Sequence, residues 1–288
     1  MARLGVITDG ISRDLERALQ VMNEFGLKYA ELQFLFGKEV GELNAQEIGK
    51  AKQLIDHHDV KVSSISRHNF AGESVFDVTV GDSWHKHQME KLKCCIDTAH
   101  ALNAPIVRIM SFTKQMILFG DNGAQDWVVS NGAWEKMLQL LLPAVELAEQ
   151  EQITLAVETG NNAMITSAFL ARKLIDDLGS QHLKVLWDPA NSLYCHEMPE
   201  PDGLNSLEGG YLAHVHIKDI AVLISRARVS NRALNEGEMS PHLQAIADWL
   251  KKKNYQGAIS LESVYRPKGG TFEDGFRSSI DAFQRIFA

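Results

Sequence analysis

The sequence contains only three cysteines among its 288 residues, and two of them, Cys94 and Cys95, are adjacent. Three cysteines are too few for a disulfide framework, and no pair has the C-x-x-C spacing of a thiolate metal site. Any metal ion would therefore be bound by histidine and carboxylate side chains.

Long apolar runs and an excess of basic residues are also absent. No uninterrupted apolar segment approaches the ~18 residues of a membrane span, and the first residues, "MARLGVITDG", lack the basic-then-apolar pattern of a secretory signal. We therefore expect a cytoplasmic protein with no membrane partner. The formal net charge of −8 repels polyphosphate backbones, so we expect no nucleic acid partner either.

Short β-branched runs recur along the whole chain, and each is followed by a loop and an amphipathic helical pattern. The expected strands are residues 4–8, 29–34, 61–66, 106–111, 154–159, 183–188, 212–219 and 258–263. Eight β-then-α units on 288 residues match the size of a (β/α)8 TIM barrel, and no Ser/Gly-rich linker divides the chain. We expect one α/β domain over residues 1–288.

A doubly wound open sheet is the alternative fold. Its first strand should be followed by a G-x-G-x-x-G turn, whereas the segment here is "ITDGISRD" with one glycine. The missing glycines favour the barrel.

The helix that follows the first strand is expected to begin at the N-cap Ser12 and to end before Gly26.

Polar residues lie at the ends of the last four expected strands. Glu158, Asp188 and Glu262 end the fifth, sixth and eighth strands, and His216 lies in the seventh. In a TIM barrel the carboxyl ends of the strands meet at the face that carries the chemistry. Three carboxylates and one imidazole suit Mn²⁺, Mg²⁺, Co²⁺ or Zn²⁺, and without a cation the carboxylates would repel one another. The sequence therefore predicts a divalent metal centre.

Four segments of the second half, "AVETGNN", "WDPANS", "HVHIKD" and "EGEMSPHLQAIADWLKKKNYQGAISLES", share a pattern with a known family. Together they resemble the xylose isomerase-like TIM barrels, in the sugar isomerase and 3-epimerase branch that includes tagatose 3-epimerase. The resemblance implies one Mn²⁺-type ion held by Glu158, Asp188, His216 and Glu262. It also implies a small sugar substrate, and a homodimer or homotetramer is a candidate assembly.

The segment "HVHIKD", residues 214–219, places His214, His216 and Lys218 on one face of a strand. In the family's H-x-H segment the second histidine is the ligand, and His216 is also the one nearer the carboxyl end of the strand. His214 is then expected one layer deeper, as a packed or supporting imidazole. Lys218 lies nearest the mouth, where it could contact a substrate oxygen or pair with a carboxylate.

Two positions depart from the 3-epimerase pattern. Asn191 replaces a histidine that helps to bind substrate, and Val222 replaces an arginine. We expect substrate contacts from His68, which follows the third strand, and from Asn191, Lys218 and Trp127. Trp127 belongs to the long segment 111–134, which we interpret as a lid or an oligomer contact, with Phe119 or Trp127 closing over a polyol.

Two further groups of charged residues have structural or binding interpretations. Arg108 is expected to face the barrel interior and to pair with a carboxylate such as Glu31. Arg226, Arg228 and Arg232, in the long segment before the last but one helix, could bind a carboxylate or phosphate. A solvated basic rim is the alternative for these three arginines.

The expected reaction is proton transfer on a ketose or related polyol through a cis-enediolate. Glu158 and Glu262 would stand on opposite sides of the reacting carbon, and return of the proton to the opposite face or to the neighbouring carbon gives epimerisation or isomerisation. A keto-inositol or dehydroshikimate-type dehydratase is the alternative on the same metal site. An endonuclease IV-like enzyme would need histidines after the fourth, sixth and seventh strands that this sequence lacks, and a non-catalytic sugar-binding barrel would bind no ion.

Overall fold

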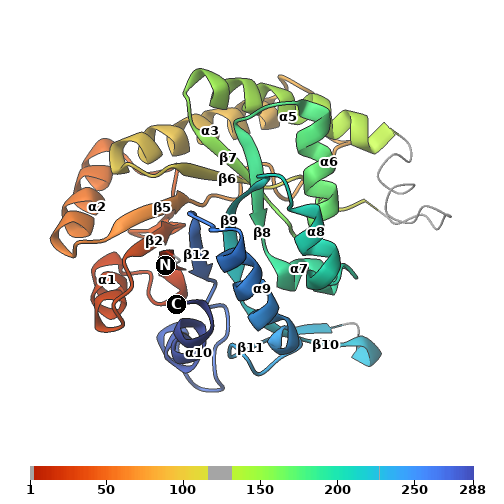
Figure 1. Cartoon of the computed structure of the whole chain (residues 1–288). Helices are drawn as coiled ribbons and strands as arrows, with labels where there is room; N and C mark the ends of the chain where they lie inside the picture. The colour runs from red at the N-terminus through yellow and green to blue at the C-terminus, as the bar shows by residue number, and fades with distance from the viewer. Residues whose placement is uncertain (1–2, 116–131, 227) are drawn as a thin grey trace.

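Eight parallel strands form a closed barrel at the centre of the molecule (Figure 1). The computed structural model describes residues 3–115, 132–226 and 228–288. Around the barrel the strands are β1 (Arg3–Ile7), β12 (Ala258–Leu261), β9 (Leu212–Ile217), β8 (Leu183–Trp187), β7 (Thr154–Glu158), β6 (Ile106–Ile109), β5 (Lys61–Ile65) and β2 (Tyr29–Leu32). Because β1 pairs with both β12 and β2, the sheet has no free edge. The expected TIM barrel is confirmed.

Helices surround the barrel and connect successive strands (Figure 1). They are α1 (Leu15–Glu24), α2 (Ala45–His57), α3 (Ser83–Leu102), α5 (Ala133–Gln150), α6 (Ala168–Leu178), α7 (Pro189–Tyr194), α8 (Leu204–Ser206), α9 (Ser240–Lys252) and α10 (Phe272–Phe287). The expected Ser12 cap of α1 is wrong, because Asp14 accepts the backbone N–H of Glu16 at 3.0 Å and is the N-cap. Among these described helices, none has the length and apolar character needed to cross a lipid bilayer.

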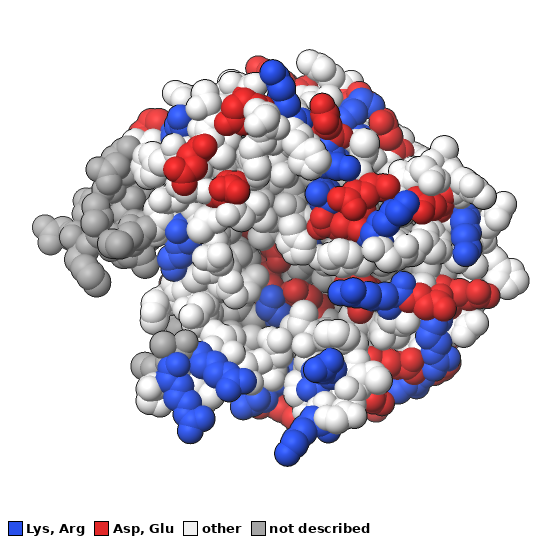
Figure 2. Space-filling model, turned by 180° about the vertical axis from the view of Figure 1, so that it is seen from behind, with Lys and Arg blue, Asp and Glu red and all other residues white. Residues whose placement is uncertain are grey.

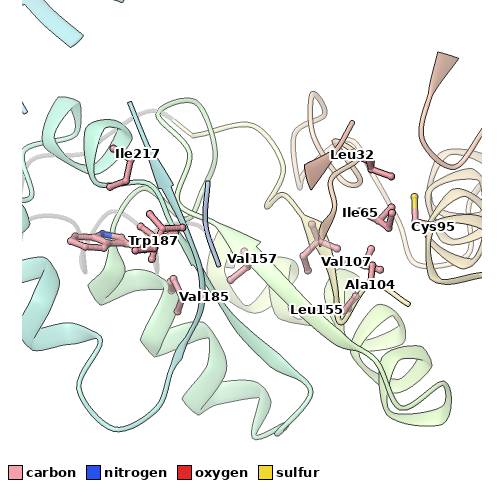
Figure 3. Packing of buried hydrophobic residues seen from close by; sticks show 14 of the residues in the cluster. Leu32, Ile65, Cys95, Ala104, Val107, Leu155, Val157, Val185, Trp187 and Ile217 are labelled. Atoms are coloured by element: carbon pink, nitrogen blue, oxygen red, sulfur yellow. The ribbon is translucent and has the colours of Figure 1, made fainter. Parts of the chain in front are cut away.

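The strands divide their side chains between two faces, as their period of two requires. The outward face packs against the helices, and Figure 3 shows Leu155, Val185 and Trp187 in this layer. Inside the barrel, Ile106, Ala156 and Leu186 form a small apolar cluster. Two residues after each of these three come Arg108, Glu158 and Asp188. A polar layer therefore lies next to the apolar one, toward the carboxyl ends of the strands.

Two antiparallel hairpins extend the carboxyl ends of the barrel strands. The first joins β3 (Phe34–Leu35) to β4 (Lys38–Glu39), and the second joins β10 (Asp219–Leu223) to β11 (Arg228–Arg232). Asp219, at the start of β10, is buried and accepts the backbone N–H groups of Gly237 and Met239, both at 2.9 Å. These bonds fix the β10–β11 hairpin against the segment that leads into α9.

The barrel strands end one or two residues before the outermost site residues. Trp187 ends β8, and Asp188 is the N-cap of α7. Leu261 ends β12, so Glu262 is the first residue of the following loop, although its backbone N–H still donates to Ile217 O at 2.9 Å. Asp188 and Glu262 therefore have backbone positions set by the barrel although they lie just beyond its strands, whereas Glu158 and His216 lie within β7 and β9.

The packing of α10 against the loop after β12 generates a stability prediction. A Cβ at Gly275 of α10 would lie 1.8 Å from the carbonyl oxygen of Tyr265, whereas a Cβ at Gly49 of α2 would meet nothing within 4 Å. Gly275→Ala should lower the free energy of unfolding by about 1–3 kcal/mol through overpacking. The control Gly49→Ala should raise it by about 0.5–1 kcal/mol, because alanine loses less backbone entropy in a helix. Urea denaturation checks both, and equal effects would contradict the close packing.

Candidate metal centre

Four side chains converge at the carboxyl end of the barrel: Glu158, Asp188, His216 and Glu262. Each offers one ligand atom, and these atoms all lie within 4.8 Å of one another. Glu158 and Glu262 line a cavity of about 420 Å³, and Asp188 and His216 are fully buried beside them. The hollow at the centre of Figure 2 contains acidic and basic side chains of this kind. We call these four residues the carboxylate–histidine cluster.

The start of α7 orients Asp188. Its Oδ1 accepts the backbone N–H groups of Ala190 at 3.0 Å and Asn191 at 3.1 Å, which is the N-cap arrangement. Its Oδ2 is buried and lies 2.6 Å from the Lys218 ammonium. One oxygen therefore caps the helix, and the other faces the cluster together with Lys218.

Glu31 orients His216. The Nε2 of His216 lies 2.9 Å from Glu31 Oε1, so the ring proton is assigned to Nε2. The remaining ring atom, Nδ1, faces Glu158 Oε1 at 3.5 Å and Glu262 Oε2 at 3.7 Å. It is buried and has no hydrogen-bond partner in the described parts of the chain. An imidazole bonded to a carboxylate through one nitrogen, with the other nitrogen free, has the orientation of a metal ligand.

Glu31 also binds the second histidine of β9. The Nε2 of His214 lies 2.8 Å from Glu31 Oε2 and 3.0 Å from Ser260 Oγ, and Ser66 Oγ donates to Glu31 Oε1. Burial raises the pKa of Glu31, but the charges and hydrogen bonds of His216 and His214 outweigh it and hold the pKa well below its usual value. Glu31, His214 and His216 are close enough to share an ion, but both Nε2 atoms are already directed at the carboxylate.

Arg108 pairs with Glu158, so the expected pairing with Glu31 is wrong. Its Nη1 lies 2.9 Å from Glu158 Oε2, and its Nη2 donates to Ser66 O at 2.8 Å. Arg108 is in register with Ala156 on β7, which brings it next to the following inward residue of that strand, Glu158. Burial raises the pKa of Glu158, but Arg108, His216 and Lys218 together outweigh it and keep the carboxylate ionised.

Lys218 lies between two members of the cluster. Its Nζ is 2.6 Å from Asp188 Oδ2 and donates to Glu262 Oε2 at 2.7 Å. Burial lowers the pKa of Lys218, but these two carboxylates and Glu158 outweigh burial and raise it above the usual value. Lys218 is therefore an ammonium ion at the mouth of the cavity, able to contact either a carboxylate or a substrate oxygen.

Carboxylates outnumber the permanent cations of this site by two. The carboxylates belong to Glu31, Glu158, Asp188 and Glu262, and the cations to Arg108 and Lys218. Burial and the neighbouring carboxylates, opposed by Lys218, raise the pKa of Asp188 to about 7. The donor set, the free Nδ1 of His216 and the surplus of carboxylates all fit a divalent ion.

Three of the four residues expected to bind substrate, His68, Asn191 and Lys218, line the cavity. His68 lines the cavity, and its Nδ1 is 3.0 Å from Glu39 Oε1. Asn191 also lines the cavity, and its Nδ2 donates to Thr159 O at 3.0 Å. Lys218 is described above. Trp127, like Phe119, lies outside the described residues.

Sequence reasoning missed four polar residues of the cavity: Asn161 and Asn162, which follow β7, and Asp9 and Gln33. Asp9 follows β1, and burial raises its pKa. Gln33 follows β2, and its Nε2 lies 3.2 Å from His68 Nδ1. Both positions come directly after a barrel strand, so the same strand-end rule that located Asp188 would have found them in the first half of the chain.

A closed (β/α)8 barrel with carboxylates and a histidine gathered at the carboxyl ends of its strands defines the class of TIM-barrel proteins with a candidate divalent metal centre. Residues 19–286 match the family model of the xylose isomerase-like TIM barrel, and the chain belongs to that family. No curated protein matches the sequence.

Several solved structures share the fold over almost the whole chain. The probable 3-DHS dehydratase of petrobactin synthesis from Bacillus anthracis is 16% identical, with 98% of each chain covered and a TM-score of 0.73. The D-psicose 3-epimerase with D-tagatose from Clostridium cellulolyticum H10 is 13% identical, with 100% of this chain and 99% of that chain covered and a TM-score of 0.70. A xylose isomerase-like TIM barrel protein from Mycobacterium smegmatis in complex with magnesium is 17% identical, with 95% and 89% covered and a TM-score of 0.66. At these identities the likeness shows the fold.

The buried position of Glu31 predicts a large effect of its removal. Glu31→Ala should lower the free energy of unfolding by about 3–5 kcal/mol, because it removes a charge that pairs with two buried imidazoles. Glu24→Ala removes a carboxylate that forms exposed ion pairs with Arg277 and Arg17 and should cost less than about 1 kcal/mol. Urea denaturation of the two variants measures the difference. A cost at Glu31 no larger than that at Glu24 would show that the imidazoles do not depend on this carboxylate.

Proposed function

We propose that the protein is a divalent-metal-dependent sugar isomerase or epimerase that acts on a ketose or related polyol by proton transfer. The observation that supports it most strongly is the buried Nδ1 of His216, which has no hydrogen-bond partner among the described residues and faces the carboxylates of Glu158 and Glu262. Mn²⁺ is the proposed ion, and Mg²⁺, Co²⁺ and Zn²⁺ suit the same donors. The magnesium complex of the Mycobacterium smegmatis protein is consistent with an ion that prefers oxygen ligands.

Glu158, Asp188, His216 and Glu262 would hold the ion. When bound, a divalent ion supplies positive charge that stabilises the negative charge developing on the sugar oxygens. Each of two ligand side chains is oriented by a bond to its other polar atom. Glu31 binds His216 Nε2 at 2.9 Å, and Arg108 binds Glu158 Oε2 at 2.9 Å. Little reorganisation of these side chains is then needed on binding.

Glu158 and Glu262 are the proposed acid–base pair. They come from β7 and the end of β12, strands that are separated in the barrel by β8 and β9, and both line the cavity. Arg108 beside Glu158 and Lys218 beside Glu262 keep the pKa of each carboxyl below its usual value, so both begin as proton acceptors.

The two carboxylates would act in turn on one substrate carbon. One removes the proton next to the carbonyl group, which leaves a cis-enediolate in the cavity. If the first carboxyl gives this proton to solvent and the second takes one up from solvent, the second can protonate the opposite face of the same carbon, which gives the epimer. Return of the proton by the first carboxyl to the neighbouring carbon gives the isomer. His68 and Asn191, which line the same cavity, are proposed to bind the hydroxyl groups.

Lys218 favours one second candidate, a dehydratase acting on a keto-inositol or dehydroshikimate-type substrate. Its ammonium group lies at the cavity beside Glu262, 2.7 Å away, and could give a proton to a departing hydroxide, which leaves as water. The Bacillus anthracis dehydratase has the same fold. For either reaction we propose a small-molecule substrate and no nucleic acid partner, in keeping with the net charge of −8, and a cytoplasmic location. A homodimer or homotetramer is the proposed assembly.

Metal removal and reloading should change stability. Protein treated with a chelator should bind one Mn²⁺ per chain, and at an ion concentration of 100 times Kd the free energy of unfolding should rise by about 2.7 kcal/mol. Asp188→Asn should weaken ion binding at least tenfold, because an amide replaces the carboxylate oxygen while asparagine can still cap α7. Asp202→Asn, at an exposed position outside the cluster, is the control. Calorimetric titration and thermal unfolding provide the measurements, and equal affinities of the two variants would contradict the site.

Exchange with solvent tests the acid–base pair. In D₂O the loaded protein should incorporate deuterium into its ketose substrate, and Glu158→Gln or Glu262→Gln should reduce the rate by at least about 100-fold with the fold retained. Glu208→Gln, on the surface beside Lys253, should leave the rate unchanged. NMR of the products after a screen of ketoses and ketopolyols supplies the readout. Retained exchange in either site variant would contradict the mechanism, and a product that absorbs ultraviolet light as a conjugated enone would identify the dehydratase.

A further inference from the structure

A second cavity, of about 550 Å³, lies beside the candidate metal centre and is lined by basic side chains. Arg228 and Arg232 come from β11, and Arg266 and Lys268 come from the loop between β12 and α10. None of the described residues that line it is acidic. Figure 2 shows basic side chains along the lower edge of the central hollow. We call the cavity lined by Arg228, Arg232, Arg266 and Lys268 the basic cavity.

The basic cavity adjoins the cavity of the metal centre. Val264 lines both of them. It is two residues after Glu262, so the two Cα atoms lie no more than about 7.6 Å apart. Asn231 of β11 donates through Nδ2 to Val264 O at 3.3 Å, which ties the hairpin to this loop. A small molecule with one end at Glu262 could therefore place its other end among the basic groups.

The backbone that carries the basic groups is anchored on both sides. The β10–β11 hairpin begins at Asp219, whose carboxylate accepts the N–H groups of Gly237 and Met239. On the other side, Gly275 of α10 packs directly against the carbonyl group of Tyr265, next to Arg266. Rigid supporting elements of this kind are what a binding site needs to hold its charged groups in place.

The basic groups have no carboxylate partners within the parts of the chain that the structure describes. No carboxylate oxygen there lies within 4.0 Å of a side-chain nitrogen of Arg228, Arg232, Arg266 or Lys268. Arg232 Nη1 donates only to the neutral oxygens of Ser230 and Asn231, at 3.0 and 3.3 Å. In a protein of net charge −8, four such cations in one cavity form a local anion-attracting region.

We propose that the basic cavity binds a phosphate group carried by the substrate, and that the substrate is therefore a phosphorylated sugar or polyol. Guanidinium groups present planar pairs of N–H donors that match phosphate oxygens. A phosphate dianion offers three acceptor oxygens and balances more of this charge than the monoanion of a sugar acid does. The assignment of the other end of the substrate to a sugar or polyol that reacts at the metal centre rests on the proposed function, but the anion site does not.

Inorganic phosphate alone tests the anion site. Protein treated with a chelator is titrated with phosphate by calorimetry, in parallel with the variant Arg228→Gln/Arg232→Gln and the control Arg285→Gln. Arg285 lies in another cavity, formed by α9 and the end of α10. The double variant should bind phosphate at least tenfold more weakly than the wild type, and the control should bind it equally well. Equal binding by the double variant, or no measurable binding by the wild type, overturns the proposal.

A matched pair of substrates tests what the anion is. The binding of a ketose and of its terminal phosphate ester is compared on the metal-loaded protein, and the ester should bind at least tenfold more tightly. The double variant should lose this preference. A wild-type preference for a sugar acid over the phosphate ester overturns the assignment to phosphate. If no ketose exchanges deuterium while phosphate binding still depends on the two arginines, the proposed reaction fails and the anion site stands.

Discussion

The carboxylate of Glu31 is the group on which the arrangement of the barrel interior depends. It comes from β2, and it binds both histidines of β9, which lies across the barrel from β2 rather than beside it. An unpaired carboxylate at this depth would cost several kcal/mol, and without it the buried Nε2–H of His216 would be left unbonded. Because both Nε2 atoms are directed at Glu31, the Nδ1 of His216 is the only ring atom of that residue left to face the cavity. The pairing therefore decides which atom of His216 can bind an ion.

Other members of the carboxylate–histidine cluster are also oriented by a bond to one polar atom, which leaves the second to face the cluster. Asp188 uses one oxygen to cap α7, and Glu158 uses one oxygen to pair with Arg108, so the second oxygen of each is left to face the others. In Asp188 and in Glu262, the oxygen that faces the cluster is also the one that Lys218 contacts. Three of the four ligand atoms are thus oriented by bonds formed elsewhere in the fold, which is the arrangement of a preorganised site.

The sequence was sufficient for the features that depend on local periodicity. Eight alternating runs identified the barrel strands, and the strand-end rule brought Glu158, Asp188 and Glu262 together because parallel strands of one barrel end at one face. It was insufficient wherever the partner depends on packing across the barrel. Arg108 bonds to the neighbouring strand rather than to Glu31, and nothing in the spacing of residues separates these two choices. The β10–β11 hairpin was missed because β11 carries one apolar residue, Val229, among four polar ones and gives no strand signal.

The opposite charges of the two adjoining cavities constrain how a substrate can lie. At the metal centre, carboxylates outnumber the permanent cations Arg108 and Lys218. The basic cavity, by contrast, has no acidic lining residue among those described. A phosphate group would be attracted to the basic cavity and would gain little at the metal centre, where Glu158 and Glu262 already supply negative charge. Only one orientation places both ends of a phosphorylated sugar favourably, with its carbonyl end against the carboxylates. The residues that would orient the substrate in this way, Glu158 and Glu262 in one cavity and the four basic residues in the other, all lie in the second half of the chain.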